Sequence, residues 1–284
     1  MSTLPTTVLV DAPSRSWVRA FGDLTAGWQH RELWSHLGWQ DIKQRYRRSV
    51  LGPIWITISM AVTAVALGLL YSQLFGLPLD FFLPYVTVGF IVWGFIQKCI
   101  SDGSEIFISN EGLIRHLPAP ISVHVYRMVW RNILFFAHNL IVYFVMLAIF
   151  YSDKFHVGWG SLLAIPAFAL LVVNGMWVGL LMGIVATRFR DIPPVTESVV
   201  QLMFFMTPIV WVYDDLLNGA KVPPGARLVE FNPFLHFVEI IRRPMLGQSF
   251  VLHYWVVALV ITVAGWLLTL LFLRNYRARV SYWV

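Results

Sequence analysis

Residues 49–79 form a run of 31 residues without a single charged side chain. An α-helix needs about 20 mostly apolar residues to cross the ~30 Å hydrocarbon core of a bilayer, so a run of this length is typical of a transmembrane helix. The composition agrees, because 58% of the residues are hydrophobic, 13% are charged and the mean hydropathy is +0.68, whereas soluble proteins carry about 25% charged residues. The sequence therefore predicts an all-α integral membrane protein.

Six segments are long and apolar enough, or nearly so, to serve as transmembrane helices. The fifth is the weakest, because Pro193, Pro194 and Glu197 lie at its start and only 16 uncharged residues follow, from Ser198 to Tyr213. The predicted spans are residues 53–75, 81–98, 131–151, 161–186, 194–213 and 249–273. We accordingly divide the chain into a cytoplasmic tail, an interfacial region and a transmembrane domain, at residues 1–19, 20–48 and 49–284.

Lys and Arg residues are distributed unevenly over the loops between these spans. Positively charged loops stay on the cytoplasmic side of a membrane. With the amino terminus inside, 16 of the 21 Lys and Arg residues fall on the inner side and five on the outer side. The first 28 residues also lack the apolar segment of a cleaved signal peptide. We expect a multi-pass protein of the bacterial plasma membrane with both termini in the cytoplasm. Because the charges flank apolar runs, no nucleic-acid partner is indicated.

A basic cluster directly precedes the first span and consists of Lys43, Arg45, Arg47 and Arg48. The region that leads into it looks helical, but its apolar side chains change faces near Gly38. We therefore expect an interfacial helix that is broken or rotated at Gly38. The basic cluster either binds an acidic ligand or only fixes how the chain enters the bilayer, by contact with anionic lipid headgroups. The sequence leaves both interpretations open.

A cytoplasmic segment between the second and third spans has the pattern of a short docking helix. Residues 105–111 can form this helix, and Gly112 is suited to end it. Pro118 and Pro120 prevent its simple continuation into the third span. The alternative is an ordinary structured loop.

A second short helix is predicted within residues 230–247. Asn232 is a suitable N-cap, Pro233 fits the first helical position and Pro244 stops the helix. The helix has about 11 residues and a length of ~16 Å, which is too short to cross a bilayer. Because its apolar residues still need burial, we expect a re-entrant hairpin at the outer leaflet, formed with the end of the fifth span.

Few residues are suited to energy coupling or catalysis. A P-loop needs a lysine directly after a glycine, and none of the four lysines meets that requirement. His138 and His253 lie within predicted spans, where a hydrogen bond to a neighbouring helix explains them as well as ion coupling does. Asp214 and Asp215 are adjacent and therefore diverge, which argues against a membrane transferase. The single cysteine, Cys99, predicts no intrachain disulfide and no thiolate metal cluster. From all these features together, we expect no metal site, no cofactor and no catalytic residue in this chain.

Six of the 13 tryptophans lie near predicted span ends, where an interfacial aromatic belt explains them. These are Trp55, Trp93, Trp130, Trp159, Trp211 and Trp255. Phe204 and Phe205 lie deeper in a span, and such rings could line the path of a glycan.

Five motifs occur in an order that resembles one family. They are "RYRRSVLGPIW", "NEGLIRHLPAP", "RFRDI", "MTPIVW" and "FNPF". Together they resemble the membrane subunit of the ABC-2 type polysaccharide exporters, the Wzm family, from about residue 20 onward, and most closely its galactan-exporting branch. The resemblance implies a homodimeric permease, six spans per subunit and two copies of a separate Wzt-type ATPase that binds ATP and Mg. It also implies export of a polysaccharide linked to a polyprenyl diphosphate, galactan or O-antigen-like, for cell wall biogenesis.

The resemblance also implies roles for individual residues. The interfacial region would act as a gate helix where the lipid enters. Residues implied to contact the lipid diphosphate or the glycan are Lys43, Arg45, Arg47, Arg48, Trp55, Phe204 and Phe205. Residues implied to couple to the ATPase are Asn110, Glu111, Gly112, Leu113, Ile114, Arg115, Arg188, Arg190 and Asp191, and those implied to form an outer gate are Trp211, Asn232, Pro233, Phe234 and Phe237. The alternatives are an ABC-2 permease for drugs or small lipids, and an ion-coupled flippase or channel.

Overall fold

The structure, a computed structural model, describes residues 15–116, 119–152, 155–213 and 226–284. These residues are mostly helical and contain no strand beyond an isolated bridge between Ser152 and Phe155. The elements are α2 (Trp17–Gln29), α3 (Arg31–Arg45), α4 (Ile54–Phe75), α5 (Leu79–Glu105), α6 (Glu111–His116), α7 (Ser122–Phe150), the 3-10 helix η1 (Trp159–Leu163), α8 (Ala164–Arg188), α9 (Ile192–Met206), the 3-10 helix η2 (Ala226–Phe231), α11 (Pro233–Met245) and α12 (Leu252–Trp283).

Five helices in the described part of the chain are long and apolar enough to cross a membrane. They are α4, α5, α7, η1 together with α8, and α12. The predicted all-α membrane class is confirmed, and these helices coincide with five of the six predicted spans. The remaining predicted span, residues 194–213, corresponds to α9, which has 15 residues. At about 22 Å, α9 is shorter than the hydrocarbon core, so six crossings remain a prediction.

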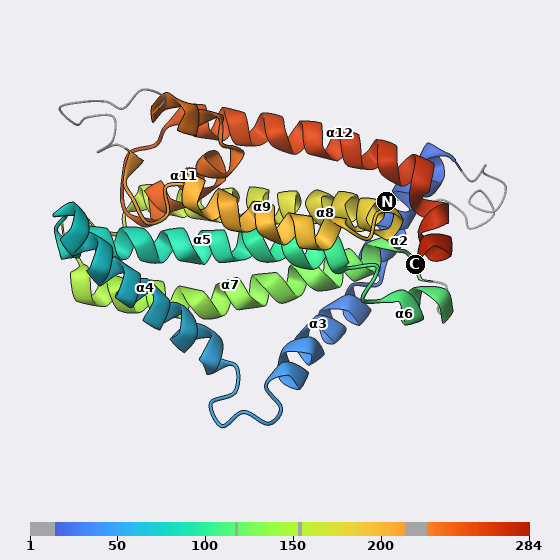
Figure 1. Cartoon of the computed structure of the whole chain (residues 1–284), viewed down its shortest axis with the longest axis horizontal. Helices are drawn as coiled ribbons and strands as arrows, with labels where there is room; N and C mark the ends of the chain where they lie inside the picture. The colour runs from blue at the N-terminus through green and yellow to red at the C-terminus, as the bar shows by residue number, and fades with distance from the viewer. Residues whose placement is uncertain (1–14, 117–118, 153–154, 214–225) are drawn as a thin grey trace.

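Helix α5 is the central element of the bundle. Most of its apolar residues are buried, and it packs against α4, α7, α8, α9 and α11. Close packing on α8 depends on glycine, because a Cβ atom on Gly103 would lie 2.9 Å from the Cα atom of Gly179. Small residues of this kind let the backbones of membrane helices approach one another. Figure 1 shows α7 along one side of α5, and α8, α9 and α12 along the other.

The predicted break at Gly38 is wrong. The N-terminal region forms two helices, α2 and α3, and the chain turns between them at His30. Gly38 lies within α3, where a Cβ atom would be 2.9 Å from Cδ1 of Trp130 and 3.2 Å from the carbonyl oxygen of Arg127. Its missing side chain therefore allows α3 to pack closely on α7, and it does not mark a flexible point.

Helix α2 is anchored by Asp23, whose carboxylate is buried. The backbone N–H groups of Ile121 and Ser122 donate to this carboxylate over 3.3 and 3.0 Å, and Arg277 of α12 pairs with it at 2.9 Å. A carboxylate at a helix start binds N–H groups that have no partner within the helix. Asp23 thus caps α7 and joins it to α2 and α12. In Figure 1, α2, α6 and the end of α12 lie at one end of the bundle, which we call the terminal end.

The predicted short helix at residues 105–111 is also wrong in its position. Helix α5 continues to Glu105, residues 106–110 form turns, and the short helix α6 runs from Glu111 to His116 with Gly112 inside it. Ile106 and Phe107 are buried against Gly183 of α8, which draws the chain into the bundle before α6 begins. Pro118 lies outside the described residues, and α7 begins two residues after Pro120.

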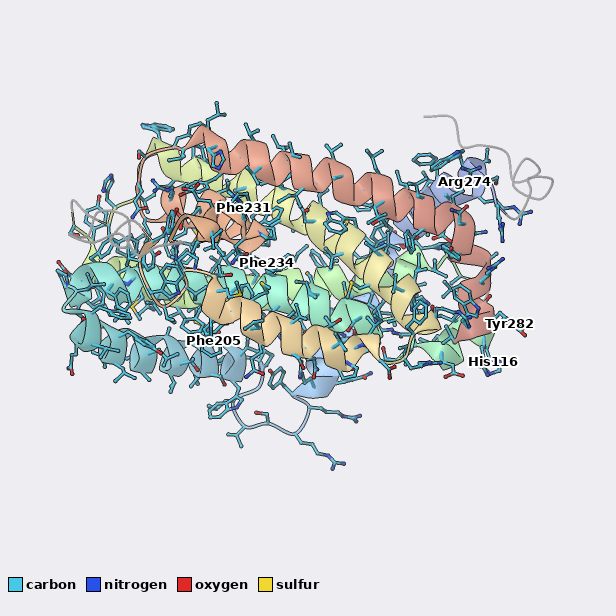
Figure 2. The ribbon with its side chains drawn as sticks, turned by 45° about the horizontal axis from the view of Figure 1, so that its top comes forward. His116, Phe205, Phe231, Phe234, Arg274 and Tyr282 are labelled. Atoms are coloured by element: carbon cyan, nitrogen blue, oxygen red, sulfur yellow. The ribbon has the colours of Figure 1, made fainter. Side chains whose placement is uncertain are left out.

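The predicted short helix after residue 230 is confirmed as α11. The side chain of Asn232 caps it by accepting from the N–H of Phe234 over 3.0 Å. Pro244 lies in its last turn, and the helix ends one residue later. Asn232 Nδ2 also donates to Thr207 Oγ1 over 2.9 Å, which joins the start of α11 to the end of α9. In Figure 1, α11 lies at the end of the bundle opposite the terminal end. Figure 2 shows His116 of α6 and Tyr282 of α12 together at the terminal end, with Phe234 of α11 well away from them.

Candidate functional site

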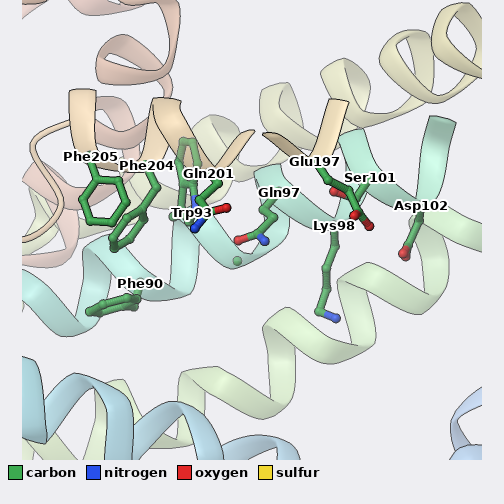
Figure 3. A pocket seen from close by; sticks show the side chains of 11 residues that line it. Phe90, Trp93, Gln97, Lys98, Ser101, Asp102, Glu197, Gln201, Phe204 and Phe205 are labelled. Carbon is green, nitrogen blue, oxygen red and sulfur yellow. The ribbon is translucent and has the colours of Figure 1, made fainter. Parts of the chain in front are cut away.

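A groove with a volume of about 770 Å³ lies between α5 and α9 (Figure 3). Its residues recur every three or four positions along each helix, which places them on one face of that helix. From α5 they are Phe90, Trp93, Gly94, Gln97, Lys98, Ser101 and Asp102, and from α9 they are Glu197, Gln201, Phe204 and Phe205. The groove is therefore a continuous stripe of two facing helices, and this periodicity was present in the sequence.

Aromatic rings form one half of the groove. Phe204 is packed between Phe90 and Trp93, with ring centroids 5.7 and 5.9 Å away, and Phe205 lies 5.2 Å from Phe204. Phe205 is 59% exposed, whereas Trp93 is buried and meets Phe234 of α11 edge-on at 5.4 Å. The structure thus brings the predicted Phe204 and Phe205 into one aromatic wall, to which Phe90 and Trp93 also belong.

Polar side chains form the other half of the groove, on the side of Lys98 and Asp102 (Figure 3). Gln97, Ser101 and Gln201 offer donors and acceptors, and Glu197 adds a carboxylate from α9. Lys98 extends from α5 toward α7, where its Nζ atom lies 4.6 Å from the ring centroid of Phe135.

An ionic network borders this polar half and ties α3 to α5 and α7. Asp41 of α3 accepts from Arg127 Nε over 2.8 Å and pairs with Arg131 at 3.4 Å. Arg131 in turn pairs with Asp102 of α5 at 2.9 Å. A smaller cavity of about 260 Å³ lies beside Asp102, Arg127 and Arg131. The network fixes the direction in which α3 leaves the bundle.

The basic cluster is divided by the fold. Arg45, the last residue of α3, lies with its guanidinium carbon 5.9 Å from the ring centroid of Phe135, the same ring that Lys98 contacts. Lys43 lies over Trp39 at 5.7 Å. Arg47 and Arg48 lie in the turn after α3, and all four residues of the basic cluster are exposed. Of the predicted basic residues, the structure therefore brings only Arg45 to the junction of α3, α5 and α7.

Trp55, also predicted to contact substrate, lies in the first turn of α4 and is half exposed. It does not line the groove. Lys98 is the functional candidate that the sequence reading missed, because it was counted only as a charge at the inner end of a span. The sequence did contain a signal, because the spacing places Lys98 on the same face of the helix as Gln97, Ser101 and Asp102.

The predicted coupling residues gather at the terminal end of the bundle. Arg115 Nε donates to the carbonyl oxygen of Val284 over 3.0 Å, and Arg190 donates to that of Trp283 over 3.4 Å. Arg188 lies 5.7 Å from the ring centroid of Trp283. The two predicted coupling segments thus meet the same end of α12. One segment consists of Asn110, Glu111, Gly112, Leu113, Ile114 and Arg115, and the other of Arg188, Arg190 and Asp191. Their role in coupling remains a prediction.

The residues predicted to form an outer gate lie where α9 ends and α11 begins. They are Trp211, Asn232, Pro233, Phe234 and Phe237. Trp211 Nε1 donates to the carbonyl oxygen of Phe205 over 3.3 Å, so this segment folds back over the aromatic half of the groove. Phe237 is buried and Phe234 contacts Trp93. The structure brings these residues together, and their role as a gate remains a prediction.

A buried ion pair holds this end together, and the sequence reading did not identify it. Arg242 is completely buried and pairs with Glu239 one turn earlier on α11. It also donates to the carbonyl oxygen of Pro208 over 2.6 Å and lies 3.8 Å from the ring centroid of Tyr85. Burial lowers the pKa of Arg242, but the carboxylate of Glu239, together with Tyr85 and Tyr254, more than offsets this, so the pKa lies above its ordinary value.

The described residues contain no group of three or more His, Cys, Asp or Glu side chains placed to hold a metal ion. Cys99 is buried as a free thiol. The groove itself offers groups that can bind a ligand, with aromatic faces at one half and hydrogen-bonding and charged groups at the other.

Comparison with known proteins gives consistent results. The family model described as "ABC-2 type transporter" matches residues 32–246. The chain is 21% identical over 232 residues to an "O-antigen export system permease protein RfbA" of Klebsiella pneumoniae, covering 80% of this chain and 86% of that protein. It is 22% identical over 186 residues to a protein of the same description from Myxococcus xanthus, covering 65% and 70%.

Proposed function

Because this chain belongs to the ABC-2 type transporter family, we propose that it is the permease subunit of an ATP-driven exporter of lipid-linked polysaccharide. The family membership that the motifs predicted is confirmed. The relatives described as O-antigen export permeases support a polysaccharide as the cargo. The proposed cargo is a glycan attached to a polyprenyl diphosphate, galactan or O-antigen-like, and the protein lies in the bacterial plasma membrane.

The observation that carries this proposal is the composition of the groove between α5 and α9. A volume of about 770 Å³ lies within the range of about 300 to 1,000 Å³ that is usual for ligand sites. The exposed ring of Phe205 offers an apolar face for the C–H groups of a sugar ring. Gln97, Ser101, Glu197 and Gln201 offer donors and acceptors for sugar hydroxyl groups. Such a mixture suits a glycan better than a purely apolar drug.

The energy source is proposed to be a separate ATPase, which binds ATP and Mg. No lysine of this chain follows a glycine, so a P-loop has to come from a partner. We place the ATPase against the terminal end of the bundle, where Arg115 and Arg190 adjoin Trp283. With this end in the cytoplasm, α11 lies toward the outer leaflet. The complete exporter contains two copies of the permease and two of a Wzt-type ATPase.

The proposal is tested by reconstituting the permease with its ATPase in proteoliposomes and measuring export of lipid-linked glycan per ATP hydrolysed. Phe205→Ala and Gln201→Ala remove groups that line the groove and are expected to lower export several-fold. Val199→Ala, at an exposed position of α9 outside the groove, is the matched control.

Three results would contradict the proposal. Export by the permease without any ATPase would indicate an ion-coupled flippase or a channel. ATP hydrolysis stimulated by small lipids and indifferent to the glycan would indicate a small-lipid exporter. Equal export by the Phe205→Ala, Gln201→Ala and Val199→Ala variants would show that the groove does not carry the cargo.

A further inference from the structure

We propose that Lys98 and Arg45 together form an anion site for the diphosphate of the lipid-linked cargo. The site lies at Phe135 of α7, between Lys98 of α5 and Arg45 at the end of α3, and its ligand class rests on the proposed function. It assigns a role to a lysine of α5 and selects one arginine from the basic cluster before α4.

Two cations from different helices converge on one aromatic ring. Lys98 Nζ of α5 and the guanidinium carbon of Arg45 of α3 lie 4.6 and 5.9 Å from the ring centroid of Phe135. Neither side chain forms an ion pair or a hydrogen bond with any residue that the structure describes. Figure 3 shows Lys98 directed toward α7, whereas Glu197 projects from α9 on the opposite side of α5. The attraction between a cation and the face of an aromatic ring is weaker than the attraction between a cation and a hydrogen-bonded anion.

The neighbouring carboxylates are already used by other arginines. Asp41 binds Arg127 and Arg131, and Asp102 binds Arg131. Asp102 also attracts Lys98 electrostatically. With the carboxylates of Asp41 and Asp102 set against four cations, the two arginines of the network together with Lys98 and Arg45, this region keeps an excess of positive charge. Two like charges close together repel each other, and a bound anion removes that repulsion. A diphosphate esterified at both ends carries about two negative charges, which matches the two cations.

The place of the pair in the fold suits a lipid-linked ligand. Lys98 lines the polar half of the groove, so a diphosphate at this point directs its sugar chain along the groove toward Phe204 and Phe205. Arg45 is the last residue of α3, at the point where α3 has diverged from the bundle before the chain returns in α4 (Figure 1). The guanidinium supplies a forked pair of donors and the ammonium a compact charge, and both kinds of group bind phosphate oxygens.

The test uses the full-length protein in nanodiscs of neutral phosphatidylcholine. The probe is a fluorescent polyprenyl diphosphate N-acetylglucosamine, and the measured quantity is its Kd. Lys98→Gln and Arg45→Gln are each expected to raise the Kd about tenfold to a hundredfold, because each removes a charged hydrogen bond. Lys98→Arg keeps the charge and is expected to retain most of the affinity. Arg31→Gln removes a charge from the exposed start of α3 and serves as the matched control.

Competition experiments identify the source of the phosphate groups. Inorganic diphosphate is expected to displace the probe, whereas phosphatidylglycerol in the nanodisc is expected to compete poorly. Equal competition by phosphatidylglycerol would show a general headgroup site and would overturn the proposal. So would an unchanged Kd in both Lys98→Gln and Arg45→Gln, or an equal loss of affinity in Arg31→Gln. Size-exclusion profiles confirm that each variant is folded.

Because binding is measured without the ATPase, the outcome is independent of export. An unchanged Kd in the two site variants, together with export that depends on the protein, would place the diphosphate elsewhere and leave the proposed function standing. The opposite combination is a raised Kd in the two site variants, together with unchanged surface polysaccharide when the protein is deleted from the cell. This result would retain the anion site and remove the exporter role.

Discussion

Replacing Glu239 should destabilise the protein more than replacing Arg242, although the two residues form one ion pair. Arg242 is completely buried, and Glu239 is its only carboxylate partner among the described residues. Glu239→Leu leaves the guanidinium with the carbonyl oxygen of Pro208 and the ring of Tyr85. Leaving a buried charge without its counterion costs about 3 to 5 kcal/mol.

Arg242→Met removes the charge itself and leaves no ion uncompensated. Glu239 retains its ion pair with Arg243, in which Arg243 Nε lies 3.1 Å from Glu239 Oε2. The loss is then mainly the hydrogen bond to Pro208 and the contact with Tyr85, which together contribute about 1 to 3 kcal/mol. In the double variant Glu239→Leu with Arg242→Met the charge penalty of the first substitution disappears, so the double variant should be more stable than Glu239→Leu alone.

The free energy of unfolding can be measured by titrating the purified protein with SDS in mixed micelles and following helicity by circular dichroism. Hydrogen exchange of peptides from α11 locates the effect. Arg31→Gln, which removes a charge from the exposed start of α3, is the control. The reasoning is refuted if Arg242→Met is as destabilising as Glu239→Leu, or if the two effects add in the double variant.

Three further predictions follow from the packing and the charges. Gly38→Ala should loosen α3 and raise hydrogen exchange in residues 31–45, because the new Cβ atom would meet Trp130 at 2.9 Å; Gly112→Ala, which meets nothing within 4 Å, should leave exchange unchanged. Asp23→Asn should lower the free energy of unfolding by about 1 to 3 kcal/mol in the SDS titration, since it weakens the charged hydrogen bonds to the start of α7. Glu111→Lys should uncouple ATP hydrolysis from export with less than about 1 kcal/mol of destabilisation, because the ion pair of Glu111 with Arg115 is exposed.

Each of these predictions has an outcome that contradicts it. Equal exchange in the Gly38 and Gly112 variants would mean that α3 does not depend on close contact with α7. An Asp23→Asn variant as stable as the wild type would remove the capping role of that carboxylate. Full coupling in Glu111→Lys would place the ATPase contact away from α6.

The sequence predicted the features that depend on local chemistry. Uncharged runs predicted the long helices, because a segment that crosses the hydrocarbon core must be mostly apolar over about 20 residues. The start of α11 was predictable from Asn232 and Pro233, since both act through their own backbone neighbourhood. Phe204 and Phe205 were selected from the sequence and both line the groove at the end of α9, and the periodicity of α5 would have added Phe90 and Trp93. Their contact with a glycan stays a prediction.

Features that depend on distant partners were not predictable from a single sequence. A glycine that provides close packing and a glycine that breaks a helix look the same until the partner is known, and at Gly38 the partner is Trp130 of α7. The start of α6 was displaced because Ile106 and Phe107 are buried against Gly183 of α8. The approach of Arg45 and Lys98 to the same ring, Phe135, likewise arises only when α3 and α5 both pack on α7.

The two ends of the bundle differ in how readily their ionic contacts can open. At the junction of α3 with α7, the side chains of Asp41, Arg127 and Arg131 are 15–25% exposed, so water reaches them and separating the partners costs less than it does for a fully buried pair. At the opposite end, Arg242 is 0% exposed and Glu239 is 8% exposed, and separating them leaves a charge in an apolar surrounding. Movement of α3 away from α7 is therefore the cheaper rearrangement. Because Arg242 also holds the carbonyl oxygen of Pro208, α11 and the segment after α9 are expected to move as one unit.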